Sequence, residues 1–282
     1  MSTGPAGPDF SPPGFVGCYR HPDRATGISC QRCRRPICGE CMEPASVGFQ
    51  CPRCVGRGRA TQRTPRTSFG AAMRTGGGSA TKTVMVVLAV VYVLDLFTGG
   101  ALLGLLVMDN SSVLSGQFWR LVTAAFTSGS LVGLLMNLLV LWLAGRAIES
   151  ELGGWRFLAL YVIAGLGGTT LFFVLGPAFG YALSASAAVV GLLAANAIGK
   201  LKGREDIRGD IGLLVLLVLY AVLVGFQTYG WLTLLGGIAV GALVGWVLAY
   251  APRRNRATVQ VVGLLAVLAF CLLGVFARLV LL

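Results

Sequence analysis

Four pairs of potential metal ligands stand near the start of this chain, and two residues separate the members of each pair. The eight side chains are Cys18, His21, Cys30, Cys33, Cys38, Cys41, Cys51 and Cys54. This gap lets both members of a pair reach one metal from a tight turn, and eight ligands fill two tetrahedral sites. The pattern predicts two structural Zn²⁺ ions, because no ligand position is left open. The alternative, a disulfide framework, disagrees with the reducing cytoplasmic location that the flanking charges predict.

Two serines in a stretch of small residues are the other candidates for chemistry. Ser184 and Ser186 lie within residues 181–195, which are apolar enough to sit in lipid. Hydroxyl groups are tolerated there because they can hydrogen-bond within their helix or to a neighbouring one. Three downstream glycines recur every fourth residue and predict a closely packed partner helix: Gly237, Gly241 and Gly245. Function therefore depends on whether that partner brings a proton acceptor to a serine.

The composition indicates a membrane protein with some soluble sequence attached. Hydrophobic residues make up 55% of the 282 residues, charged residues make up 12%, and the mean hydropathy is +0.77. A soluble domain carries about twice that share of charge. The net charge of +12 does not favour a nucleic-acid partner, because the basic residues gather in the N-terminal part and in short loops beside apolar runs. Residues 1–17 contain no long apolar run of a secretory signal.

Seven apolar segments approach the length that a membrane-spanning helix needs. They lie at about residues 83–99, 128–145, 156–175, 184–199, 211–227, 230–250 and 260–281. Lys and Arg gather in alternate loops, which predicts a cytoplasmic N-terminus and a C-terminus outside. The expected order of domains is a disordered start at 1–17, a zinc module at 18–54, a basic flexible linker at 55–82 and a membrane domain at 83–282.

Short motifs in the membrane part resemble those of the rhomboid family, the intramembrane serine proteases. In chain order they are Trp119-Arg120, Phe126-Thr127 with Asn137, Gly145-Arg146 with Glu149, Leu152 to Phe157, Ser184 to Ala187 with Gly191, and Leu235-Gly-Gly237 with Gly241. The resemblance covers about residues 82–255. It implies an all-α polytopic membrane protein, a six-helix bundle with a seventh C-terminal helix appended, preceded by the small zinc-stabilised domain. We expect it in a bacterial plasma membrane.

The order of the ligand pairs resembles a B-box-type zinc finger, in which alternate pairs share a metal. The resemblance implies one site made of Cys18, His21, Cys38 and Cys41 and another made of Cys30, Cys33, Cys51 and Cys54. Sequential pairing stays open, because spacing alone does not decide it. A segment of under forty residues has little core, so metal binding would supply much of its folding free energy. We expect this module to bind a cytoplasmic protein partner.

The rhomboid resemblance implies a Ser–His dyad with Ser186 as the nucleophile, but its partners are missing. The position of the base holds Leu234, and the position of a second histidine, beside the oxyanion-side Asn137, holds Gly133. The chain has one histidine, His21, and it belongs to the predicted zinc module. We therefore interpret Ser186 as a vestigial nucleophile.

Three hypotheses for function follow from these residues. The first is a pseudoprotease in the lipid bilayer that binds transmembrane segments of client proteins and recruits a partner through the zinc module. The second is an active serine endopeptidase that uses Ser186 with an unrecognised base. The third is a zinc-finger adaptor for which the helices are only an anchor.

Overall fold

The computed structural model describes residues 16–61, 67, 69, 78–177, 179–225, 229–252 and 254–281. The chain divides into two compact units, Met1–Thr64 and Pro65–Leu282. Each unit has its own buried cluster, so we describe them separately.

The N-terminal unit is built from short ribbons and turns around its cysteines. Strand β1 (Val16–Gly17) pairs antiparallel with β2 (Ala25–Thr26), and β3 (Glu43–Pro44) pairs with β4 (Phe49–Gln50). The 3-10 turn η1 (Gly39–Cys41) and helix α1 (Pro52–Thr61) complete it. Its buried cluster consists of six cysteines and Ile37. So small an apolar core cannot offset the entropy of ordering the chain without additional cross-links.

The boundaries expected around this unit need correction. Val16 and Gly17 lie in β1, while residues 1–15 lie outside the described part of the chain. Helix α1 extends to Thr61, into the segment that we expected to be flexible linker. Proline at the first helical position has its φ already set for a helix, and this favours a start at Pro52.

The far end of the predicted linker is also ordered. The Phe69 side chain is buried, Thr67 Oγ1 donates to the Glu151 carbonyl oxygen at 2.6 Å, and helix α2 already begins at Ser79. Residues 62–66, 68 and 70–77 lie outside the described part.

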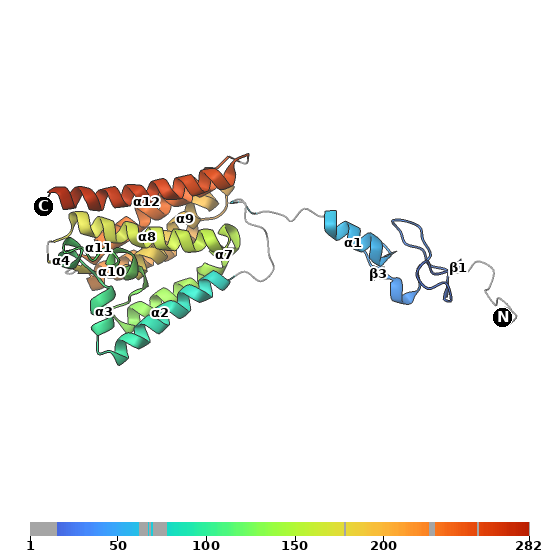
Figure 1. Cartoon of the computed structure of the whole chain (residues 1–282), viewed down its shortest axis with the longest axis horizontal. Coiled ribbons are helices and arrows are strands. Elements are labelled where there is room, and N and C mark those ends of the chain that lie inside the picture. Colours follow the sequence, from blue (N-terminus) through green and yellow to red (C-terminus); the bar gives the residue numbers. More distant parts are fainter. Residues whose placement is uncertain are drawn as a thin grey trace, which may run out of the picture. The chain divides into compact units, whose positions relative to one another are not determined.

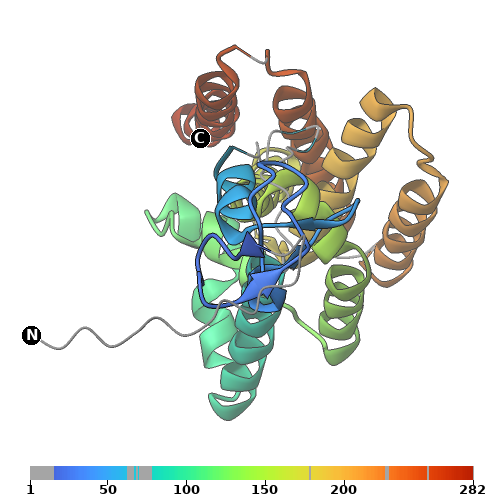
Figure 2. The ribbon, with the colours of Figure 1, turned by 90° about the vertical axis from the view of Figure 1, so that its right-hand side faces the viewer.

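The second unit is a bundle of apolar helices (Figures 1 and 2). Its long elements are α2 (Ser79–Phe97), α6 (Leu131–Val140) continued by η3 (Leu141–Gly145) and α7 (Arg146–Leu152), α8 (Gly154–Leu175), α9 (Ala185–Gly203), α10 (Arg208–Gly225), α11 (Gly230–Tyr250) and α12 (Arg256–Leu281). In the described part of the chain, six helices are long and apolar enough to cross a membrane. Helix α10 occupies the fifth predicted span, whose residues 226–227 lie outside the described part.

The second span runs farther than the sequence suggested. We expected it to end at residue 145, before Arg146 and Glu149, but the helix continues to Leu152 through a π-helical segment, η3. Glu149 is buried because its carboxylate has partners: it accepts hydrogen bonds from the backbone N–H groups of Ala80 and Thr81 and from the Thr81 hydroxyl, at 2.7–3.0 Å. The charge therefore caps the start of α2, where the helix dipole favours an anion.

The connection between α2 and α6 folds into short elements rather than a free loop. These are α3 (Ala101–Leu106), β5 (Met108–Asp109), α4 (Asn110–Leu114), α5 (Arg120–Thr123) and η2 (Ala124–Phe126). Strand β5 pairs with β6 (Tyr181–Ala182), just before α9. The Arg120 guanidinium is buried and donates to the carbonyl oxygens of Gly104 and Val107 at 2.7 and 2.9 Å, which ties α5 to α3.

Helix α12 is fixed to α8 near both of its ends. Arg156 Nε donates to Gln260 Oε1 at 2.9 Å, and Arg278 donates to the carbonyl oxygens of Phe173, Val174 and Gly176 at the end of α8. In Figure 1, α8 lies between α12 and α2. The seventh predicted span is therefore packed against the bundle.

Candidate functional site

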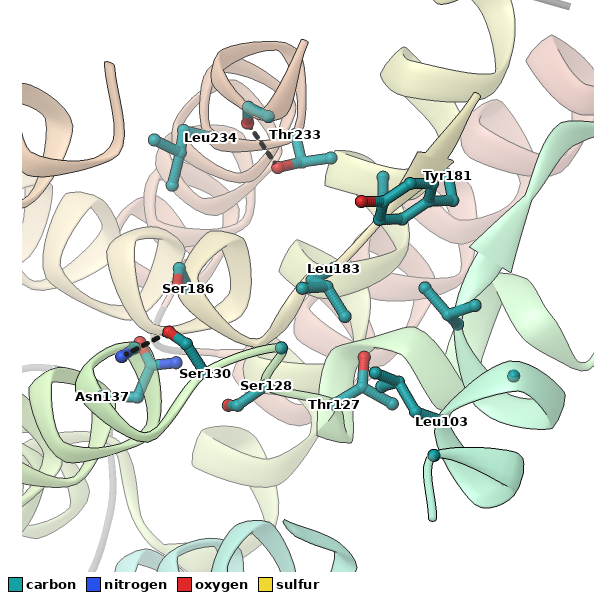
Figure 3. Close-up of a pocket in the computed structure, with 17 residues that line it drawn as sticks. Leu103, Thr127, Ser128, Ser130, Asn137, Tyr181, Leu183, Ser186, Thr233 and Leu234 are labelled. Atoms are coloured by element: carbon teal, nitrogen blue, oxygen red, sulfur yellow. Dashed lines mark hydrogen bonds between the residues drawn. The ribbon is translucent and has the colours of Figure 1, made fainter. Parts of the chain in front are cut away.

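A pocket of about 590 Å³ lies where the starts of α6, α9 and α11 meet the α3 connection (Figure 3). The four residues that the sequence marked as catalytic positions all line it: Gly133, Asn137, Ser186 and Leu234. The other lining residues are Gly100, Leu103, Gly104, Val107, Thr127, Ser128, Gly129, Ser130, Tyr181, Ala182, Leu183, Gly230 and Thr233. Tertiary packing thus gathers residues from four segments of the membrane unit around one cavity.

The two serines of the α9 start have different environments. Ser184 is fully buried, and its hydroxyl donates to the Gly165 carbonyl oxygen on α8 at 2.7 Å. Ser186 is half-buried and lines the pocket, and within the described residues no hydrogen bond joins its hydroxyl to another group. Of these two serines, Ser186 is the one that offers its hydroxyl to a molecule in the pocket.

The pocket brings no base to Ser186. Among the described lining residues there is no histidine, lysine, aspartate or glutamate, and Tyr181 carries the one ionisable side chain. The base position is taken by Leu234, which is 3% exposed on α11. A serine hydroxyl without a proton acceptor is a weak nucleophile.

The carboxylates that could have replaced the histidine are engaged elsewhere. Asp95 Oδ1 accepts from the backbone N–H of Leu103 at 2.7 Å. Asp109 Oδ2 accepts from the Ser111 and Ser112 hydroxyls and from the Ser112 N–H at 2.6–2.9 Å. Burial opposes ionisation of Asp109, but these donors outweigh it and lower its pKa. Both groups cap short helices, and neither lines the pocket.

Close approach of α9 and α11 sets the distance across the pocket. A Cβ added to Gly237 would overlap the Ala187 carbonyl, one added to Gly241 would overlap the Gly191 backbone, and one added to Gly245 would overlap Ala195. The two backbones are therefore in contact at three positions over about two turns, and only glycine permits this approach. This contact places the helix that carries Ser186 directly beside the helix that carries Leu234.

The Trp119-Arg120 motif frames the pocket from the α3 side. Arg120 holds Gly104 and Val107, two of the lining residues, through their carbonyl oxygens. Trp119 is 54% exposed and does not line the cavity. The motif's arginine thus positions the rim, while its tryptophan faces outward.

Sequence reasoning did not assign three further hydroxyl groups of the lining. Thr127 and Ser130, just before and at the start of α6, and Thr233, beside Leu234, all face the cavity. A usable signal was present, because Ser130 stands three residues before Gly133 and accepts its backbone N–H at 3.1 Å as a helix N-cap.

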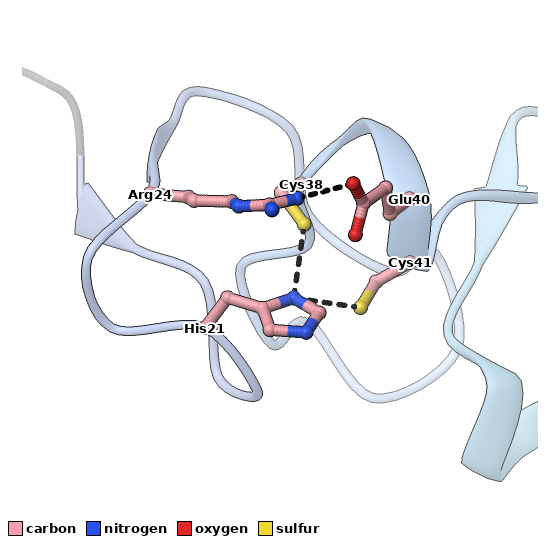
Figure 4. A network of polar contacts seen from close by, with 5 residues as sticks. All are labelled: His21, Arg24, Cys38, Glu40 and Cys41. Atoms are coloured by element: carbon pink, nitrogen blue, oxygen red, sulfur yellow. Dashed lines mark hydrogen bonds and ion pairs between the residues drawn. The ribbon is translucent and has the colours of Figure 1, made fainter.

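The N-terminal unit gathers its eight ligands into two groups. Within each group the ligand atoms lie within 4.8 Å of one another: Cys18, His21, Cys38 and Cys41 in one, and Cys30, Cys33, Cys51 and Cys54 in the other. The ligands are therefore grouped in alternate pairs, not in sequential ones. Figure 4 shows His21 Nδ1 facing the sulfurs of Cys38 and Cys41, at 3.3 and 3.5 Å.

These spacings fit a tetrahedral metal ion. With metal–sulfur bonds of about 2.3 Å and metal–nitrogen bonds of about 2.0 Å, ligand atoms lie roughly 3.5–3.8 Å apart. Cys33 and Cys51, from different pairs of the second group, have sulfurs 3.7 Å apart. Both groups can hold a metal ion with four protein ligands and no open position.

The electrostatics of the thiols also favour a cation. Burial opposes ionisation of Cys18 and Cys30, but backbone N–H donors outweigh it and lower the pKa of each to about 6. Burial and the neighbouring sulfurs raise the pKa of Cys41 to about 11, and Cys51, burial and the other sulfurs raise that of Cys54 to about 12. In the first group the hydrogen bond to His21 also lowers the pKa of Cys38. Each group can therefore hold at least one thiolate readily, but it resists ionisation of all its thiols until a cation compensates the charge.

Comparison with known proteins identifies the membrane unit. Residues 115–251 match the Rhomboid domain family model. The chain is 33% identical to the rhomboid protease GluP of Bacillus subtilis over 112 residues, which are 39% of this chain and 22% of GluP. It is 29% identical to the rhomboid protease GlpG of Salmonella paratyphi A, and likewise of Salmonella typhi, over 199 residues, which are 68% of this chain and 70% of GlpG.

The chain thus spans only about a fifth of the GluP sequence. The described helices account for a multi-pass integral membrane protein. The family match falls on the segment that contains α6 to α11 and, with them, Ser186, Asn137 and Leu234. From its helices, its pocket and these matches, the membrane unit contains a Rhomboid domain, over residues 115–251.

Proposed function

We propose that this protein is a pseudoprotease of the rhomboid family that binds transmembrane segments of client proteins without cleaving them. The observation that carries the proposal is the lining around Ser186: its described residues include no His, Lys, Asp or Glu that could take the serine proton, and Leu234 stands where a base is needed. A positioned base contributes roughly 10²–10⁴-fold to such a reaction. A pocket of this size next to lipid can still hold a polypeptide segment.

We further propose that the N-terminal unit is a structural zinc module on the cytoplasmic side of a bacterial plasma membrane. Four-ligand sites with cysteine and histidine are typical of structural Zn²⁺. The Lys and Arg residues of alternate loops favour a cytoplasmic N-terminus and an outer C-terminus. Because the module is a compact unit of its own, it is suited to recruit a cytoplasmic partner while the bundle holds the client.

The loss of catalysis is tested with the purified protein in liposomes. The protein is incubated with a fluorophosphonate probe and, separately, with a transmembrane substrate of an active rhomboid. We expect neither labelling nor cleavage. Labelling that disappears in Ser186→Ala and persists in Ser150→Ala, an exposed serine on α7 that hydrogen-bonds to Ala147, would refute the pseudoprotease and favour the active endopeptidase.

A second experiment asks how much of the chemistry is missing. Leu234→His alone should restore weak proteolysis at most, because the positions of Gly133 and Ala187 also differ from the family pattern. Adding Gly133→His and Ala187→Gly should raise activity, although a side chain at Gly133 would press on Ser130 Oγ at 3.2 Å. Robust cleavage by the single variant would contradict this proposal.

The roles of the two units are separated by deletion. Removing residues 1–54 should abolish partner recruitment and leave client binding intact. If client binding is lost together with the module, the helices are only an anchor and the adaptor hypothesis replaces ours. Metal analysis of the intact chain should give two zinc ions, and the deleted chain should contain none.

A further inference from the structure

We propose that the pocket around Ser186 selects client segments that carry an uncharged hydrogen-bonding side chain, above all the carboxamide of asparagine or glutamine. This inference rests on the proposed function, because it specifies which transmembrane segments the pseudoprotease retains. It follows from the donors and acceptors that the lining presents and from the absence of charge among the described lining residues.

Three hydroxyls of the lining already take part in a hydrogen bond to a backbone group close to them in sequence. Thr127 donates to the Ala124 carbonyl oxygen at 2.8 Å, and Thr233 donates to the Gly230 carbonyl oxygen at 2.7 Å. Both therefore offer only oxygen lone pairs to a guest. Ser130 accepts from the Gly133 N–H at 3.1 Å, so its own O–H remains available as a donor. The pocket thus presents both hydrogen-bond acceptors and a donor.

Further polar groups of the lining lack a partner within the described residues. The oxygen of Ser128 is buried without a hydrogen bond. Ser186 Oγ has no partner, and the side-chain amide of Asn137, whose residue is 2% exposed, lines the cavity with none either. An unpartnered polar group in an apolar setting costs free energy, so a guest that satisfies these groups is favoured. Figure 3 shows all three side chains around the same space.

The chemistry of the guest follows from this inventory. The lining contains no described Lys, Arg, His, Asp or Glu side chain, so an ionised guest would lie in the membrane without a counter-charge. An aliphatic guest would leave Ser128, Asn137 and Ser186 unsatisfied. A carboxamide supplies two N–H donors and one carbonyl acceptor, and this matches a lining that offers both types.

Leu234 separates the Ser186 pocket from an apolar cleft. It also lines a second cleft of about 330 Å³ between α10 and α11, whose other lining residues are Val218, Val222, Trp231, Leu235 and Ile238. That cleft offers aliphatic and aromatic surface for the apolar part of the same segment. Selectivity for a polar side chain is therefore set in the Ser186 pocket, on the other side of Leu234.

The test uses the full chain in nanodiscs and a set of synthetic peptides. Each peptide is a leucine-rich transmembrane helix with a photo-crosslinker and one varied residue, Leu, Gln or Glu, at the depth of the pocket. We expect the Gln peptide to bind about tenfold more tightly than the Leu peptide, as one or two hydrogen bonds within a membrane provide. The Glu peptide at a pH where it is ionised should bind no better than the Leu peptide.

Variants of the pocket then locate the effect. Ser128→Ala combined with Asn137→Leu should reduce the Gln preference, measured as the ratio of Gln-peptide to Leu-peptide affinity within that variant, to under about threefold. Ser150→Ala, on α7 and away from the pocket, should keep the preference. A Gln preference that survives the double variant overturns the inference.

The same experiment distinguishes this inference from the proposed function. If the three peptides bind equally well, the selection of polar side chains is wrong while client binding stands. If none of them binds, the client-binding function itself fails. A preference for the Glu peptide would also overturn the inference, because it would reveal a positive charge in the pocket.

Discussion

The two units of this protein assemble their candidate sites in different ways. In the N-terminal unit, six of the eight residues that could bind metal form the buried hydrophobic cluster of the described residues, together with Ile37. In the membrane unit, the Ser186 pocket is a by-product of helix packing, framed by glycine contacts between α9 and α11 and by the Arg120 hydrogen bonds. Substitution of a metal ligand should therefore also destabilise the N-terminal unit. The membrane unit can lack a catalytic base and still keep its fold and its pocket.

Metal removal tests the first half of this comparison and should have the largest effect. Chelation should unfold the N-terminal unit, because structural zinc contributes roughly 10–16 kcal/mol of apparent binding free energy at neutral pH, more than a small core supplies. Limited proteolysis of the full chain should show new cleavage among residues 16–61, while the thermal midpoint of the membrane unit stays unchanged. Cys30→Ser should have the same effect, and Cys271→Ser, in α12, should not. Persistent protease resistance after complete loss of metal would disprove the dependence.

A larger side chain at one of the glycines between α9 and α11 tests whether helix packing frames the Ser186 pocket. Gly241→Val should destabilise the membrane unit by about 1–3 kcal/mol, the usual cost of overpacking, because its Cβ would overlap the Gly191 backbone. The measurement is the thermal midpoint in detergent, together with binding at the pocket. Gly212→Ala in α10 is the matched control, since an added Cβ there meets nothing within 4 Å. Equal midpoints for the two variants would show that the α9–α11 contact does not hold the bundle together.

Acidification should weaken metal binding in a graded way. At about pH 7 the thiols of Cys18 and Cys30, with pKa values lowered to about 6, are largely ionised. The thiols of Cys41 and Cys54, with pKa values raised to about 11 and about 12, must release protons when a metal binds. Affinity should therefore fall about tenfold per pH unit for each proton released. Below about pH 6 the loss should steepen, as the Cys18 and Cys30 thiols also become protonated. Titration with a zinc indicator between pH 5 and 8 measures the slope, and a flat profile would rule out thiolate ligands.

The smallest expected effect concerns the ion pair between Arg24 and Glu40 beside the first ligand group. The Arg24 Nη1 and Glu40 Oε1 atoms are 2.7 Å apart, and the two side chains are 45% and 65% exposed. Figure 4 shows the pair next to Cys38. Exposed ion pairs contribute little to stability and are screened by salt. Arg24→Gln should therefore leave metal affinity within a few-fold of the native value, and a double-mutant cycle with Glu40→Gln measures the coupling. A loss as large as that of a ligand substitution would show that the pair, and not the metal, fixes this loop.

Much of the fold could be predicted because a membrane-spanning helix is recognised from a continuous run of apolar residues, which is a local property of the sequence. The 230–250 span coincides with α11, and the other spans differ from their helices by a few residues at most ends. The second span was predicted too short because it ended at residue 145, before the charged residues Arg146 and Glu149. Glu149 instead caps the start of α2 by accepting the backbone N–H of Thr81, 68 residues earlier in the sequence. No local sequence pattern predicts such a long-range contact.

The candidate pocket could be predicted only in part. A resemblance marked Ser186, Asn137, Gly133 and Leu234, and these residues do line one cavity. The environment of the two serines could not be predicted, because Ser184 is satisfied by a carbonyl on α8, and the carbonyls of a neighbouring helix are invisible in a sequence. For the same reason the roles of Thr127, Ser130 and Thr233 emerged only from the structure.

The sequence by itself determined the eight potential metal ligands, the apolar helices and the lack of any histidine in the membrane unit, since residue type and spacing are local properties. Tertiary structure alone decided that alternate ligand pairs meet, that Asp95 and Asp109 serve as helix caps, and that Ser186 faces a cavity while Ser184 does not. The physical reason is the same in each case: which polar group satisfies which depends on where the packing of distant segments brings them.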